Sequence, residues 1–304
     1  MLAVAMIPFA TLAQRPSLAS FVAIGVWYTA PVDPGPMRQD FQAIRASGFN
    51  AIMTSVSWKD GEPRRGGYNL LPLDRLIAVA TEAGLRVHVD VLTEPEPSWK
   101  TDGTNALAGT FYEYVRKRVG SHPTVINVAL PGTNPMGQND RAAVGTGPGL
   151  LTMRQARVAL WSAIARGSRG FGFGSPDDRV SAEVLALGEV AGVITRNSAL
   201  FAPLQRRQLK AGEVTVTGGG GGVSVSILES AKAIAVIAVN HSPDVRKVTI
   251  TFPPDTPEAI WQNMEAGNEV HFVMGSTGPS LEHTFTGEDV LVLTIGRKSR
   301  IPGP

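Results

Sequence analysis

The sequence predicts an α/β fold in which an abbreviated TIM-type (β/α) barrel is followed by a small all-β sandwich. Three observations support this fold class. Helical and strand-like segments alternate up to about residue 200, strand-like segments alone follow residue 205, and the alternating part is too short for a complete barrel. We expect a possible leader at 1–19, a barrel domain at 20–204 and a β-sandwich domain at 205–304.

Four glycines mark the repeat. Gly48, Gly84, Gly120 and Gly167 each follow a helical pattern and open a strand-like run, and the first three are 36 residues apart. Glycine is favoured just past a helix end because it accepts a left-handed conformation. Thr152 is expected to cap the fourth helix. The apolar positions that define the four helices are Met37, Phe41 and Ile44; Leu73, Leu76, Ile77 and Ala80; Leu107, Phe111 and Tyr114; and Val158, Trp161 and Ile164.

The second part of the chain alternates short strands with turn residues. Its strand-like runs are EVTVT, GVSVSIL, AIAVIAV, KVTITF, EVHFV and DVLVLTI, and they predict an antiparallel sandwich or small barrel. The first part, at roughly 185 residues, falls short of the roughly 250 that eight strand–helix units need. Five or six units would leave an open sheet edge, which a loop or a second copy of the chain would cover.

Composition narrows the classes of partner and cofactor. The net charge is +2 without a basic stripe, so nucleic acid is not an expected partner, and cysteine is absent. No cofactor is expected, and no metal either, because no His, Asp and Glu residues have metal-ligand spacing. The apolar run 2–13 predicts an export signal, hence a secreted or periplasmic protein, with a short buried element in a cytoplasmic protein as the alternative. No segment reaches the length of a membrane span.

The segment 24–99 carries a family resemblance. Its most specific part is Trp58…Glu62-Pro63…Gly67-Tyr68, preceded by Trp27-Tyr28 and followed by Pro97-Ser98-Trp99. This segment resembles the start of the catalytic barrel in glycoside hydrolase family 42, the β-galactosidase group of clan A. A weaker likeness at 151–204 is similar to the end of that barrel. The resemblance implies a galactoside or a related glycan as partner, and O-glycosyl hydrolysis by two glutamates after strands four and seven.

The glutamate pair is not visible in its usual context. In the best register Asn134 stands where the acid would be, and an amide cannot act as a general acid. In the alternative register the same strand is the seventh and ends at 130–132, again without a carboxylate. The remaining catalytic candidates are Glu94 and Glu96, two apart in TEPEPSW, and Asp140 in a glycine-rich loop. Solvated loop acids are the alternative interpretation.

The predicted substrate-binding residues are mostly aromatic. Trp27, Tyr28, Trp58 and Trp99 fall near predicted strand ends, where rings could stack on sugars, and core packing is the alternative. Glu62 and Asn134 complete this set, although Glu62 could equally be a scaffold residue. His88 and Asp90 share one face of the third strand and form either a proton-handling pair or a buried structural pair.

Three functions are therefore open. The first is a β-galactosidase-like hydrolase with a rearranged active site. The second is a sugar-binding protein without catalysis, and the third is a structural or assembly subunit. The resemblance favours carbohydrate in the first two, whereas the missing glutamates favour the second on mechanism.

Overall fold

The computed structural model describes most of the chain between residues 21 and 296. The described ranges are 21–31, 34–100, 106–130, 141–145, 148–175, 180–219, 221–257 and 259–296. The expected leader at 1–19 and the candidates Asn134 and Asp140 lie outside the described residues. No helix in the described ranges is both long enough and apolar enough to cross a membrane.

The first part is a parallel sheet of six strands in the order β4-β3-β2-β1-β6-β5. The strands are β1 (Ala23–Trp27), β2 (Ala51–Ser57), β3 (Arg86–Leu92), β4 (Val125–Ala129), β5 (Arg141–Ala143) and β6 (Gly170–Gly174). In a closed eight-stranded barrel the last strand pairs with the first. Beside β1, β6 takes that last place, and β5 takes the seventh. The described sheet has no strand in the fifth and sixth places, so the predicted abbreviated barrel is confirmed.

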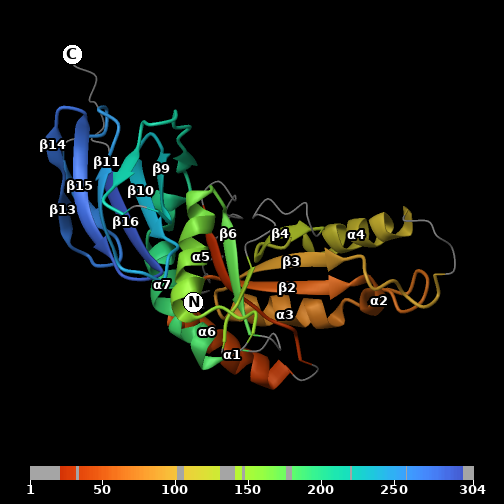
Figure 1. Ribbon diagram of the computed structural model, residues 1–304. Coiled ribbons are helices and arrows are strands. Elements are labelled where there is room, and N and C mark those ends of the chain that lie inside the picture. The colour runs from red at the N-terminus through yellow and green to blue at the C-terminus, as the bar shows by residue number, and fades with distance from the viewer. Residues whose placement is uncertain are drawn as a thin grey trace, which may run out of the picture.

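Helices cover the outer face of this sheet (Figure 1). They are α1 (Pro34–Ser47), α2 (Trp58–Gly61), α3 (Leu71–Glu82), α4 (Ala106–Val119), α5 (Met153–Ala165), α6 (Ala182–Ala186), α7 (Gly188–Arg196) and α8 (Ser198–Phe201). The four expected helices end where predicted, and Gly48, Gly84 and Gly167 have φ of 111°, 69° and 92°. Gly120 follows α4 without a left-handed φ, so the expectation of that conformation was wrong there. Thr152 caps α5 in a capping box with Gln155.

The inner face of the partial barrel is filled by large side chains that lie over glycines. Trp27 and Met53 belong to the small inner-face cluster. A Cβ on Gly172 of β6 would lie 2.4 Å from Trp27 Nε1, and a Cβ on Gly25 of β1 would lie 2.8 Å from the Ala51 carbonyl oxygen. A Cβ at Gly172 would also lie 3.0 Å from Met53 Cγ, so the absence of a side chain there leaves room for the tryptophan and the methionine.

The second part consists of two antiparallel sheets, in the orders β13-β12-β16-β10-β9-β7 and β14-β15-β11-β8. Their strands are β7 (Gln205–Arg206), β8 (Thr215–Thr217), β9 (Val223–Glu229), β10 (Ala233–Asn240), β11 (Arg246–Thr251), β12 (Ile260–Asn263), β13 (Glu269–His271), β14 (Val273–Gly275), β15 (Gly278–Phe285) and β16 (Asp289–Gly296). Trp261, Phe252 and Phe285 pack between the sheets. The predicted all-β fold of this part is confirmed.

The two parts share one apolar core. The face of β10 that points away from the smaller antiparallel sheet presents Ala235, Ile237 and Val239 to the same cluster as Trp161 of α5. As a result, all eight residues of β10 are buried. Figure 1 shows α5 between the parallel sheet and the antiparallel sheets. The helix is thus a layer common to both parts.

Replacing Gly188 by alanine is expected to lower the free energy of unfolding by about 2 kcal/mol, because overpacking costs typically 1–3. Gly188 opens α7 against the end of α1, where an added Cβ would lie 2.1 Å from the Ser47 carbonyl oxygen. Urea denaturation followed by circular dichroism measures the change. Gly109→Ala in α4 is the control: a Cβ there meets nothing within 4 Å, so alanine should be neutral or stabilising. Equal stability of the two variants would contradict the close α1–α7 approach.

Candidate functional site

The inner face of the partial barrel carries polar side chains near the carboxyl ends of its strands. Strand register aligns Trp27, Met53 and His88 at one level, and Ser55 and Asp90 at the next level toward those ends. Asn127 of β4 lies opposite His88, after a register shift between Val87 and His88. The carboxyl ends of β2 and β3 point away from the antiparallel sheets (Figure 1). Such ends are where barrel enzymes place their active sites.

His88 and Asp90 form a hydrogen-bonded pair on this face. The imidazole of His88 is completely buried, and its Nε2 lies 2.8 Å from Asp90 Oδ1. Its Nδ1 lies 3.4 Å from Asn127 Nδ2, and its ring makes a T-shaped contact with the Trp27 ring at 6.4 Å between centroids. If the Asn127 amide donates to Nδ1, then Nε2 carries the hydrogen and donates to the carboxylate. The Asp90 side chain keeps 18% of its surface exposed, so its carboxylate is both anchored and accessible.

The rim cluster, made of Trp58, Glu62, Glu96, Trp99 and Lys100, lies after β2 and β3. Glu62 is buried and accepts a hydrogen bond of 2.7 Å from Trp58 Nε1, while Trp99 Nε1 donates to the Glu62 carbonyl oxygen at 2.7 Å. The two indoles meet edge to face at 5.9 Å. Lys100 forms an ion pair with Glu96 and lies 5.4 Å above the Trp58 ring. Three predicted substrate-binding residues thus meet here and are bonded to one another.

The other candidate residues are placed separately. Glu94 is exposed on the segment that follows β3. Tyr28 lies on the helix-covered face, where its hydroxyl donates to Asp40 Oδ2 at 2.7 Å and its ring packs on Phe41 at 5.0 Å. Trp27 lies on the opposite, inner face. The alternation of side chains along a strand was the signal that could have separated these neighbours. The roles assigned to the candidate residues remain predictions.

A cavity of about 250 Å³ opens beside the ends of β1 and β2. It combines hydroxyl, amide and carboxylate groups with an apolar wall from α3. The residues lining it are Thr29, Ala30, Thr54, Ser55, Val56, Ser57, Asp60, Gly61, Asn69, Leu70, Pro72, Leu73 and Leu76. Ser55 is exposed, lines this cavity and is the register partner of Asp90 on the neighbouring strand. The carboxyl-end rim thus offers a small space with several hydrogen-bonding groups.

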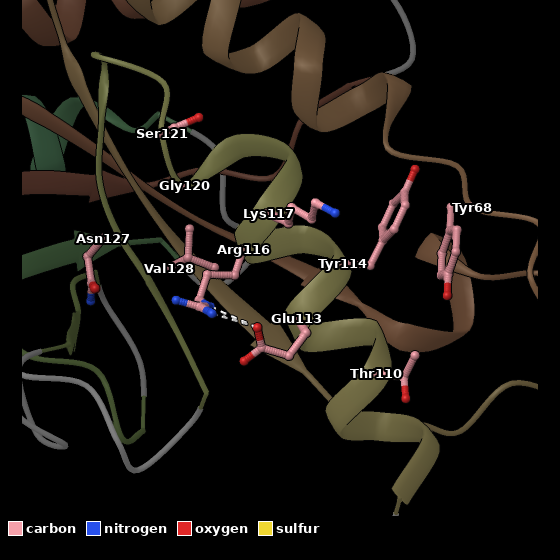
Figure 2. A pocket seen from close by; sticks show the side chains of 10 residues that line it. All are labelled: Tyr68, Thr110, Glu113, Tyr114, Arg116, Lys117, Gly120, Ser121, Asn127 and Val128. Carbon is pink, nitrogen blue, oxygen red and sulfur yellow. Dashed lines mark hydrogen bonds and ion pairs between the residues drawn. The ribbon is translucent and has the colours of Figure 1, made fainter.

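The α4 groove is a larger hollow of about 720 Å³ beside the edge strand β4 (Figure 2). Tyr68 and Tyr114 stack there with centroids 3.7 Å apart. Burial raises the pKa of Tyr68, and Glu62 and Tyr114 raise it further. Arg116 is bound to Glu113 at 2.7 Å. The inner face is the better candidate, because it lies at the carboxyl ends of the strands, where barrel enzymes place their active sites. The lining residues are Tyr68, Thr110, Glu113, Tyr114, Arg116, Lys117, Gly120, Ser121, Asn127 and Val128.

Comparison with known families and proteins bears on the first part of the chain most directly. A family model described as β-galactosidase, glycoside hydrolase family 42, matches residues 28–124. This range holds β2, β3 and the rim cluster. No curated protein matches the sequence significantly.

Solved structures resemble nearly the whole chain. A catalytic mutant of a family 42 β-galactosidase from G. stearothermophilus matches with a TM-score of 0.58 and 9% identity, covering 93% of this chain and 100% of that one. A maltogenic α-amylase from Thermotoga neapolitana matches at 0.58 and 10%, covering 93% and 100%. A family 39 glycoside hydrolase from Bacteroides cellulosilyticus matches at 0.50 and 12%, covering 92% and 82%. The family resemblance is thereby confirmed: residues 28–124 match glycoside hydrolase family 42, on a fold that glycoside hydrolases share.

Proposed function

We propose that this protein binds a carbohydrate at the inner face of its partial barrel and does not hydrolyse it by the two-glutamate mechanism. Carbohydrate is supported by the family 42 match over residues 28–124, by the polar groups that line the cavity beside the ends of β1 and β2, and by the His88–Asp90 pair of β3. A galactoside or a related glycan is the proposed ligand, because the matching family is that of β-galactosidases.

One observation supports binding over hydrolysis. A retaining glycosidase needs two carboxyl groups about 5–5.5 Å apart, and family 42 places them after strands four and seven. Here β4 and β5 hold those places in the sheet, and both lie within residues 125–145. That stretch contains a single acidic residue, Asp140. The described ends of β4 and β5, at Leu130 and Val144, carry apolar residues instead.

Titration calorimetry with galactose, lactose and galactobiose is expected to show saturable binding, with a Kd in the range of about 10 μM to 1 mM that is common for small sugars bound by few hydrogen bonds. In parallel, a panel of nitrophenyl glycosides is expected to show no turnover above the rate without protein. Bovine serum albumin is the control for nonspecific heat.

Two outcomes would count against this function. If no sugar binds, the third function, that of a structural or assembly subunit, would be favoured. Turnover of a nitrophenyl galactoside would restore the hydrolase. In that case Glu94→Gln and Glu96→Gln would show whether these two glutamates supply the missing carboxylates.

A further inference from the structure

Asp90 carries a carboxylate within the parallel sheet. Among the residues of the six strands that the structure describes, it is the only acidic one. It is also the polar residue nearest the carboxyl end on the inner face of β3, one level above the buried His88. A carboxylate on a central strand of a barrel costs desolvation energy, so its presence needs a compensating partner or a use.

His88 supplies the partner and fixes the direction of the carboxylate. The imidazole holds Asp90 Oδ1 at 2.8 Å and itself contacts Asn127 and, in a T-shaped arrangement, the Trp27 ring. The His88 ring is completely buried and cannot rotate freely. The Asp90 oxygen that is bonded to it, Oδ1, therefore points toward the interior. Oδ2 is then the oxygen left to meet a ligand from the exposed side.

Ser55 extends this acceptor into a two-residue site. It is the register partner of Asp90 on the neighbouring strand and is exposed. Neighbouring strands are about 4.8 Å apart, so one group on each strand can bond to one of two hydroxyl groups on adjacent carbons of a sugar ring. A carboxylate accepts hydrogen bonds from hydroxyl groups strongly because the acceptor is charged.

We propose that Asp90 and Ser55 bind a vicinal pair of hydroxyl groups on a saccharide, and that His88 is the positioning residue that aims the Asp90 carboxylate. The proposal rests on the carbohydrate binding proposed above and names the atoms that carry it. Trp27 lies one level below and closes the floor of the site with an apolar ring.

The test uses calorimetry with methyl β-galactoside and its monodeoxy derivatives on the whole protein. Asp90→Asn is expected to weaken binding about tenfold or more, the loss that about 1.4 kcal/mol produces. The deoxy sugar that lacks the hydroxyl group bonded to Asp90 should bind the wild type more weakly by a similar factor. The same deoxy sugar should bind the Asp90→Asn variant almost as well as the parent sugar does. Asp255→Asn, which makes the same change at an exposed aspartate of the antiparallel part, is the matched control and should bind like the wild type.

The positioning role is tested separately at His88. His88→Gln keeps a nitrogen donor near the place of Nε2 and is expected to retain most of the affinity, whereas His88→Leu should lose it while circular dichroism confirms folding. Equal affinities of the wild type and Asp90→Asn, or equal sensitivity of both to every deoxy sugar, would overturn the proposal and leave carbohydrate binding standing. Absence of binding by the wild type would overturn both.

Discussion

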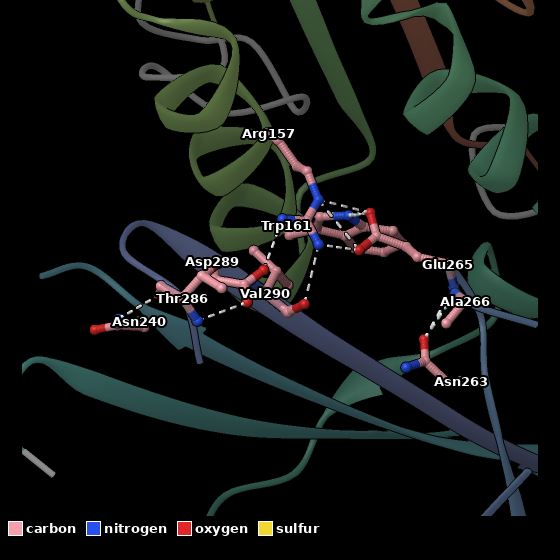
Figure 3. A network of polar contacts seen from close by, with 9 residues as sticks. All are labelled: Arg157, Trp161, Asn240, Asn263, Glu265, Ala266, Thr286, Asp289 and Val290. Carbon is pink, nitrogen blue, oxygen red and sulfur yellow. Dashed lines mark hydrogen bonds and ion pairs between the residues drawn. The ribbon is translucent and has the colours of Figure 1, made fainter. Parts of the chain in front are cut away.

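Replacing Arg157 by alanine is expected to lower the free energy of unfolding by about 3 kcal/mol, because removing one partner of a largely buried ion pair leaves uncompensated charge. Arg157 lies on α5, where its Nε is 3.0 Å from Glu265 Oε1 and its Nη1 is 2.9 Å from Asp289 Oδ1 (Figure 3). Its Nη2 donates to the Val290 carbonyl oxygen at 3.0 Å. Trp161, one turn further along α5, also donates to Glu265, at 2.8 Å.

Chemical denaturation followed by circular dichroism and tryptophan fluorescence measures this loss. The matched control is Arg38→Ala, which removes an exposed arginine. The side chains of Arg38 and its ion-pair partner Glu82 are 55% and 59% exposed. Such a pair contributes about 0–1 kcal/mol. The Arg157 side chain is only 24% exposed. Indistinguishable midpoints for the two variants would show that the α5 network adds nothing to stability.

The same network predicts a dependence on pH. Burial opposes ionisation of Asp289, but hydrogen bonds from Arg157 and from the backbone N–H groups of Val290 and Thr286 outweigh it and hold the pKa of Asp289 below its ordinary value. A carboxyl group with a lowered folded-state pKa stabilises the fold above its unfolded-state pKa of about 3.9 and loses that contribution as the pH falls through the folded value. We expect Arg157→Ala to weaken the acid-dependent loss of stability below about pH 4 relative to Arg38→Ala.

Glu62→Ala is expected to cost about 3 kcal/mol, since a buried donor left without an acceptor costs about 1–3 and a second, partly buried hydrogen bond is lost with it. The carboxylate of Glu62 accepts from Trp58 Nε1 and from the Gly66 backbone N–H, both at 2.7 Å. Trp58 is completely buried, so water cannot replace the lost acceptor without opening the rim cluster. Urea denaturation monitored by tryptophan fluorescence measures the loss and reports on the Trp58–Trp99 contact.

Two variants separate the scaffold role of Glu62 from the predicted role in substrate binding. Glu82→Ala removes an exposed glutamate and should change stability by less than about 1 kcal/mol. Glu62→Gln keeps one acceptor and should lie between the wild type and Glu62→Ala. If Glu62→Gln binds galactosides as tightly as the wild type, then the carboxylate acts on the fold of the rim; a wild-type stability for Glu62→Ala would instead remove the scaffold role.

The repeating part of the fold was predictable because its signals are local. Gly48, Gly84 and Gly167 end helices with positive φ, and the apolar spacing before them gives the helices. β5 escaped prediction because three residues, Arg141–Ala143, carry no usable periodicity. β15 also escaped prediction, because its apolar and polar residues alternate only weakly: Pro279, Glu282 and His283 interrupt the pattern.

The site was predictable only in part, for the same reason. Alternation places His88 and Asp90 on one face of β3, but Asn127 lies opposite His88 because of a register shift that no local pattern reveals. The bonds of Glu62 with Trp58 and Gly66 span four residues and belong to a motif that the sequence shows. The contact of Arg157 with Glu265 spans 108 residues and becomes visible only in three dimensions.

The layer formed by α5 has a consequence for how this protein could arise or be divided. A chain divided near residue 204 would give one fragment in which Trp161 keeps its contact with Phe201 but loses its neighbours from the second part, and another with Ala235, Ile237 and Val239 facing water. Both fragments would expose an apolar surface that favours aggregation. Each part is therefore expected to need the other in order to fold as a stable protein.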